Sequence, residues 1–194
     1  MALTLILWKV MRLAALGAWS GGGRTQTAVD AWQAGETAAA VGAVAGVHSI
    51  RARVAAAGFG AVGAPEFSAH DAEAEITRVA KAELAEARRG LKTLDMIATI
   101  APLLGLLGTV VGMIAAFQAM QAAGARTDPA ALAGGIWEAL LTTAAGMAVA
   151  IPATMALGWL ESVIDRLRGD LEDIGTRILL PRKAPTQSVA EAAE

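Results

Sequence analysis

The stretch MIATIAPLLGLLGTVVGMIAAFQAM, residues 96–120, decides the fold of this chain. It lies within thirty consecutive residues, 96–125, that carry no charged side chain. A helix rises about 1.5 Å per residue, so about 20 residues cross the hydrocarbon core of a bilayer. A second uncharged run, residues 139–160, lies between Glu138 and Glu161. The sequence therefore predicts an all-α integral membrane protein with a hairpin of two spanning helices.

The composition supports this fold class and argues against several functions. Of the 194 residues 55% are hydrophobic and 18% are charged, with a mean hydropathy of +0.50, as in small membrane proteins. There is no cysteine, and His48 and His70 lack ligand-like spacing, so we expect no metal site and no cofactor. No nucleophile with a neighbouring base and no phosphate-binding loop is recognisable, so we expect no enzyme, and no nucleic acid partner.

The basic residues are distributed unevenly, and this predicts the topology. Ten of the sixteen precede Met96, five follow Glu161, and Arg126 alone lies between the spans. Lysine and arginine collect on the cytoplasmic side of a membrane. We therefore expect residues 21–93 and 161–180 to be cytoplasmic, spans at residues 94–123 and 137–160, and a periplasmic loop at residues 124–136.

The N-terminal residues 1–20 form an unusual segment. MALTLILW supplies eight mostly apolar residues before Lys9 and Arg12, too few to span a bilayer. We interpret this segment as the inner part of a first transmembrane helix whose outer part is missing, as a start codon assigned too far downstream would produce. N-terminal sequencing of the native protein would test this interpretation.

The flanking segments carry helical patterns. Residues 68–93 have strong helix formers, and we expect this charged helix to run without a break into the first span. Asp128 and Pro129 are a helix-starting pair, and the second helix should continue beyond residue 160 as an amphipathic extension. The tail, residues 181–194, is predicted to be disordered.

Small residues spaced four apart mark the faces on which membrane helices pack. We assign helix packing to the small residues Gly105, Gly108, Gly112, Gly146 and Ala150, and Gly158 extends the row on the second span. Prolines inside helices lose a backbone hydrogen bond, so bends are expected at Pro102 and Pro152.

Four threonines lie well inside the spans, Thr109, Thr142, Thr143 and Thr154, and Glu138 stands at the outer end of the second span. Each hydroxyl can bond back to a carbonyl of the preceding turn, or it can face a hydrated path and relay a proton. Glu138 suits either a plain position among lipid headgroups or a pore mouth. We take Thr109, Thr142, Thr143 and Glu138 as candidates for lining a proton path.

The two spans also resemble a known family. APLLGLLGTVVGMIAAFQ, residues 101–118, and DPAALAGGIWEALLTTAAGMAVAIPA, residues 128–153, are similar to the ExbB/TolQ/MotA proton channels, and most similar to ExbB and TolQ. The resemblance implies a bacterial inner-membrane protein with three transmembrane helices, whose pore-lining threonines are Thr109 and Thr143 and whose second-span glutamate is Glu138.

The resemblance also implies partners. Five copies ring two single-span chains of the ExbD/TolR type, and proton flow drives motion that reaches a TonB-like or TolA-like protein and energises transport or envelope functions. From the residues alone, no acidic group lies at mid-membrane between residues 96 and 160, so a titratable carboxylate must come from a partner helix. Two alternatives remain open: a flagellar-type stator subunit, and a non-conducting membrane scaffold.

Overall fold

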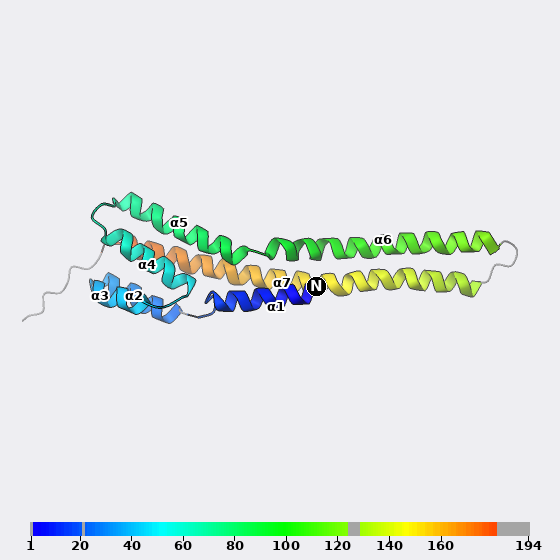
Figure 1. The fold of residues 1–194 in the computed structure, drawn as a ribbon, viewed down its shortest axis with the longest axis horizontal. Coiled ribbons are helices and arrows are strands. Elements are labelled where there is room, and N and C mark those ends of the chain that lie inside the picture. Colours follow the sequence, from blue (N-terminus) through cyan, green and yellow to red (C-terminus); the bar gives the residue numbers. More distant parts are fainter. Residues whose placement is uncertain (1, 21, 124–128, 182–194) are drawn as a thin grey trace, which may run out of the picture. The chain divides into compact units, whose positions relative to one another are not determined.

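The computed structural model describes residues 2–20, 22–123 and 129–181, and every regular element in these ranges is an α-helix. The all-α fold class is thereby confirmed. Figure 1 labels the helices and colours them along the sequence, from blue at the N-terminus to red at the C-terminus. Their bounds are α1 Ala2–Ala15, α2 Gly22–Gln33, α3 Thr37–Val44, α4 Ile50–Gly63, α5 Ala69–Arg88, α6 Leu91–Ala123 and α7 Pro129–Leu179.

The helices form two compact units. The first, which we call the hairpin unit, consists of Met1–Lys9 and Gly90–Leu160; the second, the helical unit, consists of Val10–Arg89 and Glu161–Glu194. The hairpin unit contains α6 and most of α7. The helical unit contains α2 to α5 and the last part of α7.

The hairpin unit holds two helices that are long and apolar enough to cross a membrane. One candidate span lies within Ala69–Ala123, whose apolar part is α6, and the other within Leu132–Leu179. Their most apolar windows have mean hydropathies of 2.2 and 1.7, yet only 6% and 17% of those residues are buried inside the chain. An apolar surface of this kind is unlike the buried core helix of a water-soluble domain and suits contact with lipid.

The start of α6 differs from the sequence prediction. Instead of one unbroken helix, α5 ends at Arg88 and α6 begins at Leu91. Gly90 between them has φ +85°, a left-handed conformation that terminates helices and that glycine adopts without strain. A Cβ atom at Gly90 would lie 3.2 Å from the ring of Trp8, so the position is crowded as well as left-handed.

The helix that contains the second candidate span begins eight residues before the predicted span. α7 starts at Pro129, so residues 129–136 of the expected loop are helical, and proline occupies the first helical position, where its missing N–H costs nothing. Pro102 and Pro152 lie inside α6 and α7, and neither ends its helix. Most of the predicted disordered tail and of the loop's first half, residues 182–194 and 124–128, lies outside the described residues.

The helical unit has a conventional apolar core. Trp32 stacks on Phe59 with ring centroids 4.6 Å apart, and its indole N–H donates to the carbonyl of Ile178 at 3.2 Å. The apolar face of α7 beyond the span is buried there. Its buried members are Val163, Ile164, Leu167, Leu171, Ile174 and Ile178. His48 and His70 are exposed.

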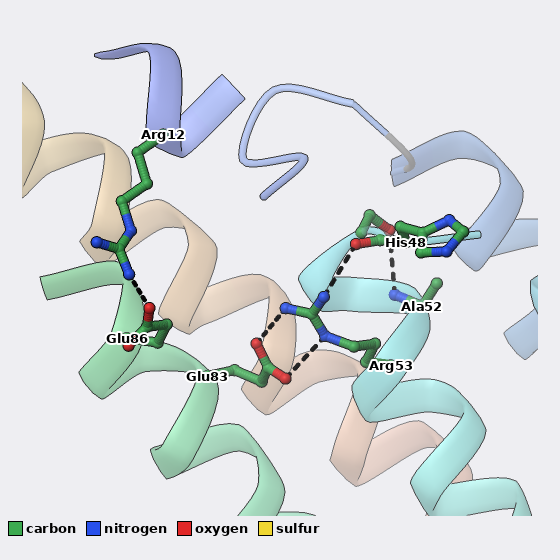
Figure 2. Close-up of polar contacts among 7 residues, drawn as sticks. Arg12, His48, Ala52, Arg53, Glu83 and Glu86 are labelled. Atoms are coloured by element: carbon green, nitrogen blue, oxygen red, sulfur yellow. Dashed lines mark hydrogen bonds and ion pairs between the residues drawn. The ribbon is translucent and has the colours of Figure 1, made fainter. Parts of the chain in front are cut away.

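Ion pairs connect α5 to other helices of the helical unit. Figure 2 shows Glu86 of α5 paired with Arg12 and Glu83 paired with Arg53 of α4. Arg53 donates from Nε to Glu83 at 2.8 Å and also to the backbone carbonyl of His48 at 3.2 Å. Each carboxylate of these pairs is therefore held by a guanidinium from a distant part of the chain.

Candidate functional site

Backbone contact between α6 and α7 is possible because glycines line it. A Cβ atom at Gly146 would lie 2.6 Å from the carbonyl oxygen of Ala101 and 3.1 Å from the Cα of Gly105. A Cβ atom at Gly105 would lie 3.0 Å from the Cα of Thr143. Any side chain at Gly105 or Gly146 would therefore push the two backbones apart.

The same close approach continues toward the outer end of the hairpin. A Cβ atom at Gly112 would lie 2.9 Å from that of Ala139, and one at Gly135 would lie 2.7 Å from that of Ala116. As residue numbers rise on α6 they fall on α7, as expected for antiparallel helices in contact along their length. Gly135 was not among the sequence candidates, although its spacing of four from Ala139 was the available signal.

Two other small residues of α7 behave differently from each other. Ala150 is 6% exposed, so it is buried in the hairpin unit. Gly158, the last member of the predicted row, has no atom of another helix within 4 Å of the place where a Cβ would stand. The row of small residues therefore packs against α6 over only part of its length.

The threonine hydroxyls divide into two groups by their bonds. Thr143 donates across the hairpin to the carbonyl of Gly105 at 3.0 Å. Thr109 donates to Leu106 at 2.7 Å and Thr154 to Ala150 at 2.9 Å, each within its own helix. Thr142 donates to Ala139 at 2.7 Å, with a longer contact of 3.4 Å to Gly105. Only Thr143 has its main hydroxyl bond on the other helix.

The positions of these hydroxyls around the hairpin follow from the helical period. We call the mean direction of the residues at which the two helices meet the contact line of each helix. These residues are Ala101, Gly105, Gly108, Gly112 and Ala116 on α6 and Gly135, Ala139, Thr142, Gly146 and Ala150 on α7. A helix turns about 100° per residue, so Thr109 lies about 60° past the contact line of α6, in the direction in which the helix turns. Thr143 lies about 60° past the contact line of α7, and Thr154 lies three turns further along nearly the same line. In an antiparallel pair the same sense of rotation leads to the same side. We call this side, with Thr109, Thr143 and Thr154, the threonine flank.

The other two candidates lie elsewhere. Thr142 packs against Gly108, where a Cβ would come within 2.5 Å of the Thr142 Oγ1 atom. Glu138, which is exposed, lies about 80° before the contact line of α7, on the side opposite the threonine flank. The hairpin thus brings Thr109 and Thr143 together and separates Thr142 and Glu138 from them.

The spans supply few ionisable groups. Between residues 96 and 160 these are Arg126, Asp128 and Glu138, and the first two lie outside the described residues. In the part of the chain that the structure describes, no group of three or more His, Cys, Asp or Glu side chains could hold a metal ion. The chemical groups that the hairpin presents are the hydroxyls of the threonine flank, which lie beside the tightly packed contact between α6 and α7, the seam of the hairpin.

A comparison with protein families agrees with this chemistry. Residues 46–173 match the model of the MotA/TolQ/ExbB proton channel family, which covers about two thirds of the chain and includes both spans. A search of curated proteins found no match.

Proposed function

The chain belongs to the MotA/TolQ/ExbB proton channel family, and from this premise we propose that it is an inner-membrane proton-channel subunit of the ExbB/TolQ type. Its partner in this proposal is a single-span chain of the ExbD/TolR type. The complex uses the proton-motive force to energise transport or envelope functions through a TonB-like or TolA-like protein. The chain itself has no catalytic role in the proposal.

One observation carries the need for a partner. The threonine flank offers three hydroxyls but no carboxylate within residues 96–160. A hydroxyl can pass a proton along or solvate it, but it does not hold one at neutral pH, whereas a carboxylate shifted by its surroundings does. In our proposal the partner helix brings the carboxylate to the threonine flank, and Thr109 and Thr143 form its polar surroundings.

A ring of copies explains the candidates on the other side of the hairpin. Glu138 and Thr142 do not share a flank with Thr109 and Thr143, so one hairpin cannot place all four in a single path. In a ring, both flanks of each hairpin face neighbouring copies or the central partner. We propose that this chain assembles in such a ring, a pentamer by analogy with the family, with Glu138 near the outer mouth.

The proposed orientation places the helical unit in the cytoplasm. The basic residues before Met96 and after Glu161 support this side, because lysine and arginine favour the cytoplasmic face. The segment between the two spans is then periplasmic. Labelling of single introduced cysteines from one side of the membrane would test this orientation, since the chain has no cysteine of its own.

The threonines give the central test. The variant with both Thr109→Val and Thr143→Val keeps side-chain shape but removes the two hydroxyls. In liposomes that contain the chain and its single-span partner, we expect proton flux to fall by about tenfold or more, because the path loses its polar lining. Assembly, followed by size-exclusion chromatography, should be unchanged.

Thr99→Val is the matched control, because Thr99 is an exposed threonine of α6 that lies about 140° from the contact line with α7 and so off the threonine flank. Its flux should stay near that of the wild type. If the double variant conducted as the wild type does, the role of Thr109 and Thr143 would be rejected.

Co-purification separates the channel from a scaffold. A single-span chain with an aspartate in its span, recovered with the protein from native membranes, would support the channel. Recovery of a water-soluble partner alone would favour a non-conducting scaffold.

A further inference from the structure

Asp95 stands at the inner end of α6, immediately before the uncharged stretch that begins at Met96. Its side chain is exposed, although Leu94 beside it is only 1% exposed and Ala98, one turn later, 9%. Lys92, one turn before it on the same helix, is exposed as well. Asp95 therefore presents a carboxylate to water at the edge of the span, beside a buried face.

The position of Asp95 around α6 is close to that of Thr109. Fourteen residues separate the two, which is nearly four full turns, so they differ by only about 40° in direction and by about 21 Å along the axis. Pro102 lies midway between them. Asp95, Pro102 and Thr109 thus form one line of α6 on the threonine flank, and Pro102 and Thr109 are both half-buried.

The opposing helix brings a hydroxyl to the same level. The contact of Ala101 with Gly146 anchors the two helices near their inner ends. Asp95 comes six residues before Ala101 on α6, and Thr154 comes eight residues after Gly146 on the antiparallel α7. Both therefore lie about 9 to 12 Å from this contact, toward the inner end of the hairpin. Thr154 belongs to the threonine flank, and Asp95 is the carboxylate at its level.

The chemistry of a proton path gives this placement a meaning. Hydroxyls and water can pass a proton along the flank, but its transfer to bulk water is helped by a group that binds and releases protons. An exposed carboxylate at the inner end can do both. A proton arriving along the flank forms an O–H bond with a carboxylate oxygen of Asp95, and the same proton then leaves to water, so the carboxylate is regenerated.

We propose that Asp95 is the inner-end proton acceptor of this channel, receiving the proton from the threonine flank near Thr154 and releasing it to water. The inference rests on the proposed function and adds a residue of this chain to the proton route. A purely structural role is the competing explanation, in which the charge of Asp95 only holds the inner end of the span at the membrane surface.

The test uses the full chain in complex with its single-span partner, reconstituted in liposomes that contain a pH-sensitive dye. Asp95→Asn and Asp95→Ser should each lower proton flux by about tenfold at an imposed potential, because neither side chain can hold the proton. Asp95→Glu should recover most of the flux. Assembly and thermal midpoint, measured on the same samples, should change little for all three variants.

The control variant is Glu66→Gln, which removes one negative charge from an exposed position in the helical unit and should leave the flux unchanged. Wild-type flux from Asp95→Asn or Asp95→Ser would overturn the inference while leaving the channel intact. Equal loss in Asp95→Glu, accompanied by a lowered thermal midpoint, would also overturn it in favour of the structural role. An absence of flux through the wild-type complex would instead overturn the proposed function itself.

Discussion

Thr143 shows how one side chain can serve packing and chemistry at once. Its hydroxyl donates to the carbonyl of Gly105, an interhelical bond of a type worth on average about 0.6 kcal/mol in a membrane protein. That carbonyl can keep its helical N–H partner if the hydroxyl is removed. Loss of the hydroxyl should therefore affect the hydration of the flank far more than the stability of the hairpin, which is why the valine variants test conduction cleanly.

Ser68 and Asp71 carry a prediction about pH. Asp71 accepts hydrogen bonds from the Ser68 hydroxyl at 2.6 Å and from its backbone N–H at 3.1 Å, and these bonds lower the pKa of Asp71 below 3.8, the side-chain bond most strongly. A lowered folded-state pKa stabilises the fold fully above the unfolded value, and this contribution disappears as the pH falls through the lowered value. The capping box should thus weaken only in acid.

We expect Ser68→Ala to lower the stability of the helical unit at neutral pH by about 1 kcal/mol, the usual cost of losing an N-cap side chain. The variant should also lose part of the acid dependence below pH 3.8, the ordinary value for Asp71. Denaturation in mild detergent at several pH values measures both effects. Thr77→Ala, in the same helix but away from the cap, should keep the wild-type pH profile; an unchanged profile in Ser68→Ala would contradict the prediction.

At the scale of elements, the close packing of α6 on α7 depends on glycines at the contact, where any side chain would hold the helices apart. Lipid is as apolar as leucine, so the two spans gain little from burying apolar surface and associate through close packing instead. Gly105 and Gly146 bring backbone against backbone, and Gly112 and Gly135 each admit an alanine of the other helix. The exposed leucines on the outer faces of the helices take no part in this seam.

Gly146→Ala tests the seam directly. The added methyl group would come within 2.6 Å of the Ala101 carbonyl oxygen, and this backbone atom cannot move without shifting α6. We expect a loss of about 1 to 3 kcal/mol, as for overpacked cores. Thermal unfolding in detergent, followed by circular dichroism, provides the measurement.

Gly158→Ala makes the same chemical change in the same helix where space is open. It should be neutral or slightly stabilising, because alanine favours helix over glycine by about 0.5 to 1 kcal/mol. Equal behaviour of the two variants would show that the seam is not as tight as described.

At the scale of the molecule, the two units have different surfaces. The hairpin unit exposes large apolar side chains along both spans, for example Leu103 at 59% and Leu107 at 57%. The helical unit buries its apolar residues and carries its charges in pairs such as Arg51 with Asp170. One unit is therefore suited to lipid and the other to water.

The expected outcome in cells is integral membrane association. The protein should stay in the membrane pellet after washing with high salt or alkaline carbonate and should enter solution only with detergent, because each span loses its lipid contacts otherwise. Leu107→Asp should reduce insertion, at a cost of about 3 kcal/mol for aspartate at a span centre. Release of the wild-type protein as a water-soluble monomer would contradict the fold class.

The sequence by itself determined the two spans, the stripes of small residues and the apolar face of the α7 extension. These features depend on hydropathy and on the helical period, which are local properties of the chain. The resemblance in residues 101–118 and 128–153 likewise predicted the family that the match over residues 46–173 confirms.

Only the tertiary structure decided which residues meet. The helix break at Gly90 has a left-handed backbone and lies against the ring of Trp8. Arg12 pairs with Glu86, which is 74 residues away in the sequence. Thr142 and Thr143 are neighbours in sequence, yet only the contact line between α6 and α7 shows that one packs on Gly108 and the other joins Thr109 on the threonine flank. The helical period predicts the direction in which each side chain leaves its own helix. Whether side chains of two helices lie on the same side of the hairpin depends on how the helices pack, and this is visible only in the tertiary structure.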